Sequence, residues 1–137
     1  AGLLHDIDYD SAGADPARHS LVGAEMLEGM GVDPDVVYAV RVHNDRHGLP
    51  RISAMDKALH AVDPLTGLIV ASALIHPSKK LSAIDVGFVI NRYHEKGFAR
   101  GANREQIALC SELGMEFPEF VGVCLEAMQK NAAELGL

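Results

Sequence analysis

Apolar residues recur every three or four positions along most of this chain, a spacing that places them on one face of a helix. The pattern is clear after Asp15, where Val22, Met26 and Met30 form an apolar stripe with His19 at its head. Capping aspartates, prolines and glycines set the expected helix ends. We expect helices over 16–30, 34–43, 54–76, 82–94, 103–113 and 117–137.

No strand is predicted anywhere in the sequence, and we find no internal repeat, low-complexity tract or linker. The 137 residues fit one domain that can bury a core without disulfides. We therefore expect an all-α fold, a compact helical bundle forming a single domain over 1–137. Because Ala1 falls in what we expect to be the last turns of a helix and is not Met, we also expect an N-terminally truncated sequence.

Composition and charge narrow the range of functions. Hydrophobic residues make up 48% of the chain and aromatic residues 5%, and tryptophan is absent, which suits close helix packing. The net charge of −7 argues against a nucleic-acid polymer as partner, because neutralising phosphates requires a basic face that the sequence does not show. The negative net charge does not argue against a small anionic substrate, since a bound cation reverses the local potential.

The cysteines and the apolar segments favour a cytoplasmic location without membrane attachment. Cys110 and Cys124 lie in predicted apolar helices without CxxC spacing, so we expect buried thiols rather than a disulfide. The longest apolar stretch, 65–75, is about half the ~20 residues that a membrane span requires. No secretory signal is recognised.

The candidate chemistry is carried by histidines and aspartates beside apolar residues. His5 and Asp6 are adjacent at the expected end of a helix, and His19, His43 and Asp63 follow on separate predicted helices. Imidazole suits Zn, Fe, Ni and Co, and carboxylate suits Mg and Mn, so the mixed set indicates a divalent metal. A cation held there would polarise a phosphoryl oxygen and lower the pKa of its bound water, giving a hydroxide nucleophile near neutral pH.

This arrangement resembles the HD superfamily of metal-dependent phosphohydrolases, and within it the HDIG-type proteins. The resemblance covers residues 1–75 and includes the apolar run Gly2-Leu3-Leu4 that precedes the His-Asp pair. It implies an HD-domain helical bundle that binds one or two divalent cations, among Fe, Mn, Co, Ni, Zn and Mg.

The resemblance also assigns roles to the five candidate ligands. It implies that His5 and Asp6 bind the primary metal and that Asp63 is the distal carboxylate ligand of the same metal. It implies that His19 and His43 bind a second cation, or approach the substrate phosphate where only one metal is present.

Asp6 and Asp8 are the candidate catalytic residues. Asp8, like Asp10, is a candidate for general acid–base catalysis or for orienting His5. The alternative is that Asp8 and Asp10 are turn-forming residues before the glycine-containing loop 11–16. Some members of the resembled family carry a glutamate three residues after the motif aspartate; Tyr9 stands there in this chain, so that assignment does not transfer.

Two features leave alternatives open. Asp63 precedes Pro64, so it is either a metal ligand within a long helix or the N-cap of a helix that begins at Pro64. The family's primary site also includes a histidine on an upstream helix, which this sequence does not contain. We expect a hydrolase acting on a small phosphorylated substrate such as a nucleotide; the alternative is a catalytically incomplete HD-fold module that binds a ligand or partner.

In the C-terminal third of the sequence we recognise no candidate catalytic or binding residues. Lys79, Lys80 and the basic residues of 92–100 are expected on solvated helix surfaces. The last helix has a broad apolar face, which packs either on the core or on another subunit of a homodimer.

Overall fold

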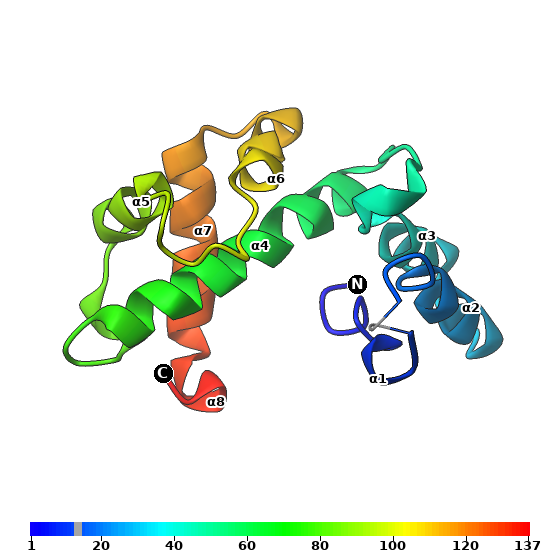
Figure 1. The fold of residues 1–137 in the computed structure, drawn as a ribbon, viewed down its shortest axis with the longest axis horizontal. Coiled ribbons are helices and arrows are strands. Elements are labelled where there is room, and N and C mark those ends of the chain that lie inside the picture. Colours follow the sequence, from blue (N-terminus) through cyan, green and yellow to red (C-terminus); the bar gives the residue numbers. More distant parts are fainter. Residues whose placement is uncertain (13–14) are drawn as a thin grey trace. The chain divides into compact units, whose positions relative to one another are not determined.

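The computed structural model describes residues 1–12 and 15–137, and no strand occurs in these ranges, so the all-α prediction is confirmed (Figure 1). Gly13 and Ala14, in the predicted loop 11–16, lie outside the described residues. The helices are α1 (Tyr9–Ala12), α2 (Leu21–Gly29), α3 (Pro34–Val42), α4 (Ala54–Ile75), α5 (Val86–His94), α6 (Arg104–Ala108), α7 (Phe117–Lys130) and α8 (Ala132–Leu135). Short 3-10 helices lie at Asp45–His47, Leu81–Ala83 and Leu109–Leu113.

The chain divides into two compact units, Ala1–His60 and Ala61–Leu137. The division falls within α4, so the first turns of this helix belong to the first unit and the rest to the second. The expectation that 1–137 forms one domain stays a prediction.

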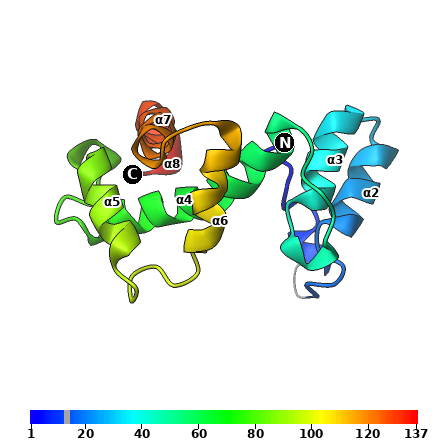
Figure 2. The ribbon, with the colours of Figure 1, turned by 90° about the horizontal axis from the view of Figure 1, so that it is seen from above.

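In the first unit α2 and α3 pack side by side (Figure 2). α3 begins where the sequence predicts, because the Asp33 carboxylate accepts a hydrogen bond of 2.9 Å from the Asp35 N–H and Pro34 follows it. The hydroxyl of Ser20, just before α2, donates to the carbonyl of Arg41 near the end of α3. The start of α2 and the end of α3 therefore lie together. The buried core between the helices consists of Ala24, Leu27, Val37 and Val40.

The second unit has its own apolar core between α4, α5, α6 and α7. α5 and α7 contact each other directly, and the Gln129 amide of α7 donates to the carbonyls of Leu81 and Ile84. The fully or almost fully buried side chains of this core include Leu65, Leu68, Ile69, Val89, Ile107, Phe120, Val121 and Leu125.

α4 continues through Pro64, so the alternative in which a helix begins at Pro64 is wrong. Proline removes one helical N–H and is costly inside a helix unless the surroundings compensate. Asp63 thus lies within a helix, as the metal-ligand interpretation requires.

By length and composition alone, α4 could cross a membrane, whereas the sequence analysis expects no such segment. Half of its most apolar window is buried within the structure. A core helix of a soluble protein meets the same test, and α4 supplies core residues such as Leu65 and Leu68.

Candidate metal centre

Three segments of the first unit bring histidines and an aspartate together. His5 and Asp6 lie in consecutive turns over 2–8, where the N–H groups of Leu4 and Ile7 each bond a carbonyl three residues earlier. His19 lies in the turn before α2, and His43 is the C-cap residue of α3. One ligand atom from each of Asp6, His19 and His43 lies within 4.8 Å of the others, so this group could hold a metal ion.

The Asp6 carboxylate lies between His5 on one side and His19 and His43 on the other. Its Oδ1 atom is 3.3 Å from Nε2 of His19 and 3.7 Å from Nε2 of His43, and these two nitrogens are 3.3 Å apart. Its Oδ2 atom is 3.4 Å from Nε2 of His5. The ring of His43 stands edge-on to the rings of both His5 and His19, with centroids 5.2 and 5.1 Å away. The two carboxylate oxygens therefore face different histidines.

The hydrogen bonds on the other side of each ring fix which nitrogen carries the proton. Nδ1 of His5 lies 2.7 Å from the Gly2 carbonyl, and Nδ1 of His43 lies 2.6 Å from the Val40 carbonyl. A carbonyl oxygen only accepts, so Nδ1 is the donor in both rings. Nδ1 of His19 likewise donates to Oδ1 of Asp8 at 2.9 Å. In the neutral rings all three Nε2 atoms are then lone-pair acceptors.

This arrangement of nitrogen and oxygen atoms is more favourable with a bound cation than without one. Two facing lone pairs at 3.3 Å repel each other, and a nearby carboxylate adds to the negative potential. Ligands about 2.0–2.1 Å from a tetrahedral cation lie ~3.3–3.4 Å apart, close to the separations observed here. Protonation is the other way to relieve the repulsion, but burial lowers the pKa of His43, and the charges of His5 and His19 lower it further. Its backbone hydrogen bond to Val40 and the charge of Asp6 act in the opposite direction.

Asp8 is fully buried and holds His19 in place. Its Oδ2 atom accepts the backbone N–H of Ser20 at 2.8 Å and that of Gly23 at 2.9 Å. Burial alone would raise the pKa of Asp8, but the bonds from Gly23, His19 and Ser20 outweigh it and lower the pKa. An ionised carboxylate behind a ligating imidazole fixes its tautomer and raises its basicity. From the sequence, Asp8 is a candidate for acid–base catalysis or for orienting His5. The structure shows it bonded to His19, and its acid–base role stays a prediction.

The same aspartate explains why α2 begins later than predicted. Sequence pattern places the helix start near Pro16, but residues 16–20 form turns and α2 begins at Leu21. Ser20 adopts a positive φ of 73°, uncommon for a residue other than glycine, and it is fully buried. Its N–H points to Asp8 in this conformation. The helix start is therefore set by a carboxylate twelve residues away, and the strain falls beside the candidate site.

Gly23 allows α2 to approach Asp8 closely. A Cβ atom at position 23 would lie 3.3 Å from Cγ and 3.4 Å from Oδ2 of Asp8, and 3.4 Å from a methyl of Ile7. These distances are tighter than ordinary side-chain contacts. Since three hydrogen bonds hold Asp8, it has little freedom to move aside.

Other candidate residues lie in different places. His60 is buried in α4, and its Nδ1 atom lies 3.1 Å from the His43 carbonyl, so it supports the segment that carries His43. Nε2 of His47 lies 2.8 Å from the carbonyl of His19. Asp10 is exposed in α1. Asp63 belongs to the second unit, where it lines a cavity of about 390 Å³, and its role as distal ligand stays a prediction.

Several groups that shape the centre are not recognisable in the sequence. The carbonyls of Gly2 and Val40 and the N–H groups of Ser20 and Gly23 act through the backbone, so side-chain type gives no signal for them. Only the glycine at position 23, inside an apolar helical stripe, hints at a close approach.

Comparison with known proteins gives a partial similarity. No family model matches the chain, and no solved structure matches it. Ribonuclease Y from Oleidesulfovibrio alaskensis is 34% identical over 71 residues, which cover 49% of this chain. They cover only 12% of that protein, so the chain spans a small part of its length. This partial similarity is to a protein named as a ribonuclease, and it does not specify a substrate or reaction for this chain.

Proposed function

We propose that this chain is an HD-type, metal-dependent phosphohydrolase whose first unit supplies four of the five proposed metal ligands. The observation that carries the proposal is the set of Nδ1 hydrogen bonds, which leaves Nε2 of His5, His19 and His43 as acceptors around the Asp6 carboxylate. Structural histidines need no such convergence. The sequence resemblance to the HD superfamily and the partial similarity to a ribonuclease support the same class.

Asp6 would be the shared ligand of this centre. Its Oδ2 atom, with His5, would serve one cation, and its Oδ1 atom, with His19 and His43, would serve a second cation or the substrate phosphate. Asp63 is the proposed distal carboxylate ligand. A divalent cation bound there supplies Lewis acidity and a bound water of lowered pKa. Among the metals, the imidazole-rich set favours Fe, Mn, Co, Ni or Zn over Mg.

The proposed residues have separable tasks. Asp6 and the three imidazoles bind, whereas Asp8 keeps the lone pair of His19 directed at the site by holding its Nδ1 proton. The exposed side of Asp6, 47% of whose side-chain surface is accessible, gives substrate a route to the ligands, while His43 is almost fully buried. A general acid for the leaving group is not assigned.

We propose a small phosphorylated compound as the substrate. The net charge of −7 disfavours a long polyanion, because binding one requires many phosphate contacts. RNA is a second candidate, because the similar protein is a ribonuclease by name. A catalytically incomplete module that binds a ligand or partner is the third.

The test is hydrolysis by the purified chain, reconstituted in turn with Mn²⁺, Co²⁺, Ni²⁺, Zn²⁺, Fe²⁺ and Mg²⁺. The substrates are a panel of phosphomonoesters and nucleotides, a phosphodiester and single-stranded RNA. Asp6→Asn and His43→Gln remove proposed ligands, and Asp35→Asn and His94→Gln are matched controls at exposed positions outside the centre. We expect metal-dependent turnover of a small phosphate ester that falls at least about a hundredfold in the ligand variants only.

Each result assigns the chain to one of the three functions. Turnover of RNA alone would favour the ribonuclease, and metal binding without turnover of any substrate would favour the binding module. Full activity of Asp6→Asn would contradict the metal assignment, whichever substrate is cleaved.

A further inference from the structure

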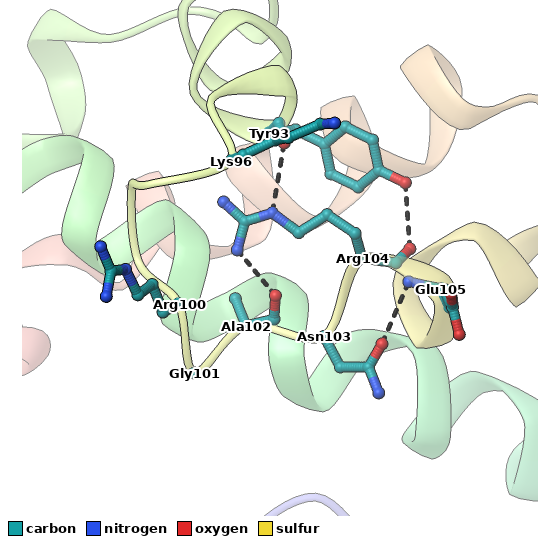
Figure 3. A pocket seen from close by; sticks show the side chains of 8 residues that line it. All are labelled: Tyr93, Lys96, Arg100, Gly101, Ala102, Asn103, Arg104 and Glu105. Carbon is teal, nitrogen blue, oxygen red and sulfur yellow. Dashed lines mark hydrogen bonds between the residues drawn. The ribbon is translucent and has the colours of Figure 1, made fainter.

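The second unit contains a cavity of about 610 Å³ in the segment between α5 and α6 (Figure 3). Three cationic side chains line it, Lys96, Arg100 and Arg104, against a single carboxylate, that of Glu105. This excess of positive charge occurs in a chain whose net charge is −7. A cationic concavity in an anionic protein raises the local concentration of small anions.

Arg104 organises the wall of this cavity. Its guanidinium donates to the carbonyls of Phe98, Ala99 and Ala102 at 2.6–2.7 Å, and more weakly to those of Arg92 and Tyr93. Figure 3 shows this side chain between the backbones of Tyr93 and Ala102. The hydrogen-bond partners of its guanidinium are neutral carbonyls, and no carboxylate among the described residues cancels its charge.

The same bonds hold the backbone in a costly conformation. Ala99 has a positive φ of 42°, and its carbonyl accepts from Arg104. Such backbone strain persists only where the surroundings enforce it, and it concentrates at functional sites. The consequence here is a fixed loop that places Arg100 and Gly101 on the cavity wall.

Lys96 and Arg100 remain available to a ligand. Both are exposed, and the part of the chain that the structure describes shows no ion pair or hydrogen bond for either side chain. By contrast, the neighbouring Arg92 is paired with Glu95 at 2.6 Å. Both residues line the cavity, and a guanidinium and an ammonium each suit the oxygens of a phosphate group.

The cavity adjoins the one that Asp63 lines. Gly101 and Ala102 form part of the wall of both, and the second cavity also includes Gln106. A ligand larger than a single phosphate could therefore extend from the cationic cavity toward Asp63 within this unit.

We propose that Lys96 and Arg100, on the loop fixed by Arg104, form a binding site for the phosphate group of a small ligand. The inference goes beyond the proposed function, because it needs neither a metal nor turnover. It assigns chemistry to a segment in which the sequence analysis expected only solvated surface.

The test is titration of the ¹⁵N-labelled full chain with inorganic phosphate, followed by amide chemical shifts. EDTA is present throughout, so any failure of the metal centre cannot affect the result, and sodium chloride at equal ionic strength is the salt control. The variants are Arg100→Ala and Lys96→Ala. Lys80→Ala, which removes one charge from an exposed position of the same unit, is the matched control.

We expect saturable shifts at Gly101 and Ala102 with phosphate and not with chloride. Arg100→Ala should weaken phosphate binding about tenfold or more, Lys96→Ala should weaken it to a smaller extent, and Lys80→Ala should not change it. Because Lys96 and Arg100 are exposed, the amide spectra should otherwise keep the wild-type pattern. Absence of saturable shifts, equal shifts with chloride, or unchanged binding in Arg100→Ala would each overturn the proposal.

Discussion

The Nε2 atoms of His19 and His43 face each other at 3.3 Å, although the hydrogen bonds at both Nδ1 atoms leave a lone pair on each Nε2. His19 lies in the turn before α2 and His43 lies at the end of α3, and these two helices pack side by side. The fold therefore holds together two groups whose lone pairs repel each other, an arrangement that a cation between them would stabilise.

Asp8→Asn should disable His19 without removing a ligand. The asparagine oxygen can accept from Ser20 and Gly23, but its amide would then oppose Nδ1–H of His19. The ring should change to the tautomer with the proton on Nε2. Since that nitrogen then has no lone pair, it cannot bind a metal. We expect metal affinity to fall about 10–100-fold, typical for loss of such a partner.

The tautomer of His19 can be read from its ring ¹⁵N shifts in the metal-free protein. Asp35→Asn, at an exposed position of the same unit, is the control and should keep wild-type affinity. Wild-type metal affinity in Asp8→Asn would show that Asp8 does not position His19.

Gly23→Ala should destabilise the first unit. The new methyl would press on Asp8 and Ile7 at 3.3–3.4 Å, and Asp8 cannot yield without losing a hydrogen bond. We expect a loss of about 1–3 kcal/mol in the free energy of unfolding, measured by urea denaturation.

Gly29→Ala, at the last residue of the same helix, is the matched control. A Cβ atom there meets nothing within 4 Å, so the substitution should be neutral or stabilise by up to about 1 kcal/mol. Equal effects of the two substitutions would mean that the approach of α2 to Asp8 is not constrained.

Arg104→Met should destabilise the second unit far more than Arg100→Ala. It removes a guanidinium bonded to five carbonyls and keeps an apolar stem of similar length. We expect a loss of about 2 kcal/mol or more, because charge-assisted hydrogen bonds are lost and carbonyls are left unpaired. Arg100→Ala, an exposed site, should change the free energy by less than about 0.5 kcal/mol.

Cys124 should react slowly with thiol reagents at mild alkaline pH. Burial raises the pKa of its thiol to about 11, and the neighbouring Cys110 adds to this effect. At pH 8 its thiolate fraction is far below that of an ordinary cysteine, so alkylation should be at least about tenfold slower than in the unfolded chain. The rate should keep rising as the pH increases toward 11, and a plateau near pH 8.5 would contradict the raised pKa of this partly buried thiol.

Local signals predicted much of the fold. The Asp33 and Pro34 pair marks the start of α3, and the apolar pattern after Ala54 predicts α4 almost to its last residue. The start of α2 was not predictable in this way. Asp15 accepts the Ala17 N–H as a cap does, but the positive φ of Ser20, whose N–H bonds Asp8, separates these turns from α2.

For the site, side-chain type predicted His5, Asp6, His19 and His43 as ligands, and the structure brings these residues together. The carbonyls that set the tautomers of His5 and His43 are backbone groups, which side-chain type does not reveal. The cationic cavity was missed because its form depends on the path of the loop around Arg104, and no residue pattern encodes that path.

Binding of a divalent cation by Asp6 and the histidines is open to a simple assay. The most direct measurement is the metal content of the purified chain by inductively coupled plasma mass spectrometry, after incubation with each cation and removal of the excess. We compare wild type with the double variant Asp6→Asn, His43→Gln, after confirming by circular dichroism that both are helical. We expect about one or two equivalents of Fe, Mn, Co, Ni or Zn in wild type and loss of most of this metal in the variant. No bound metal in the wild-type chain, or equal metal in both proteins, would contradict this expectation.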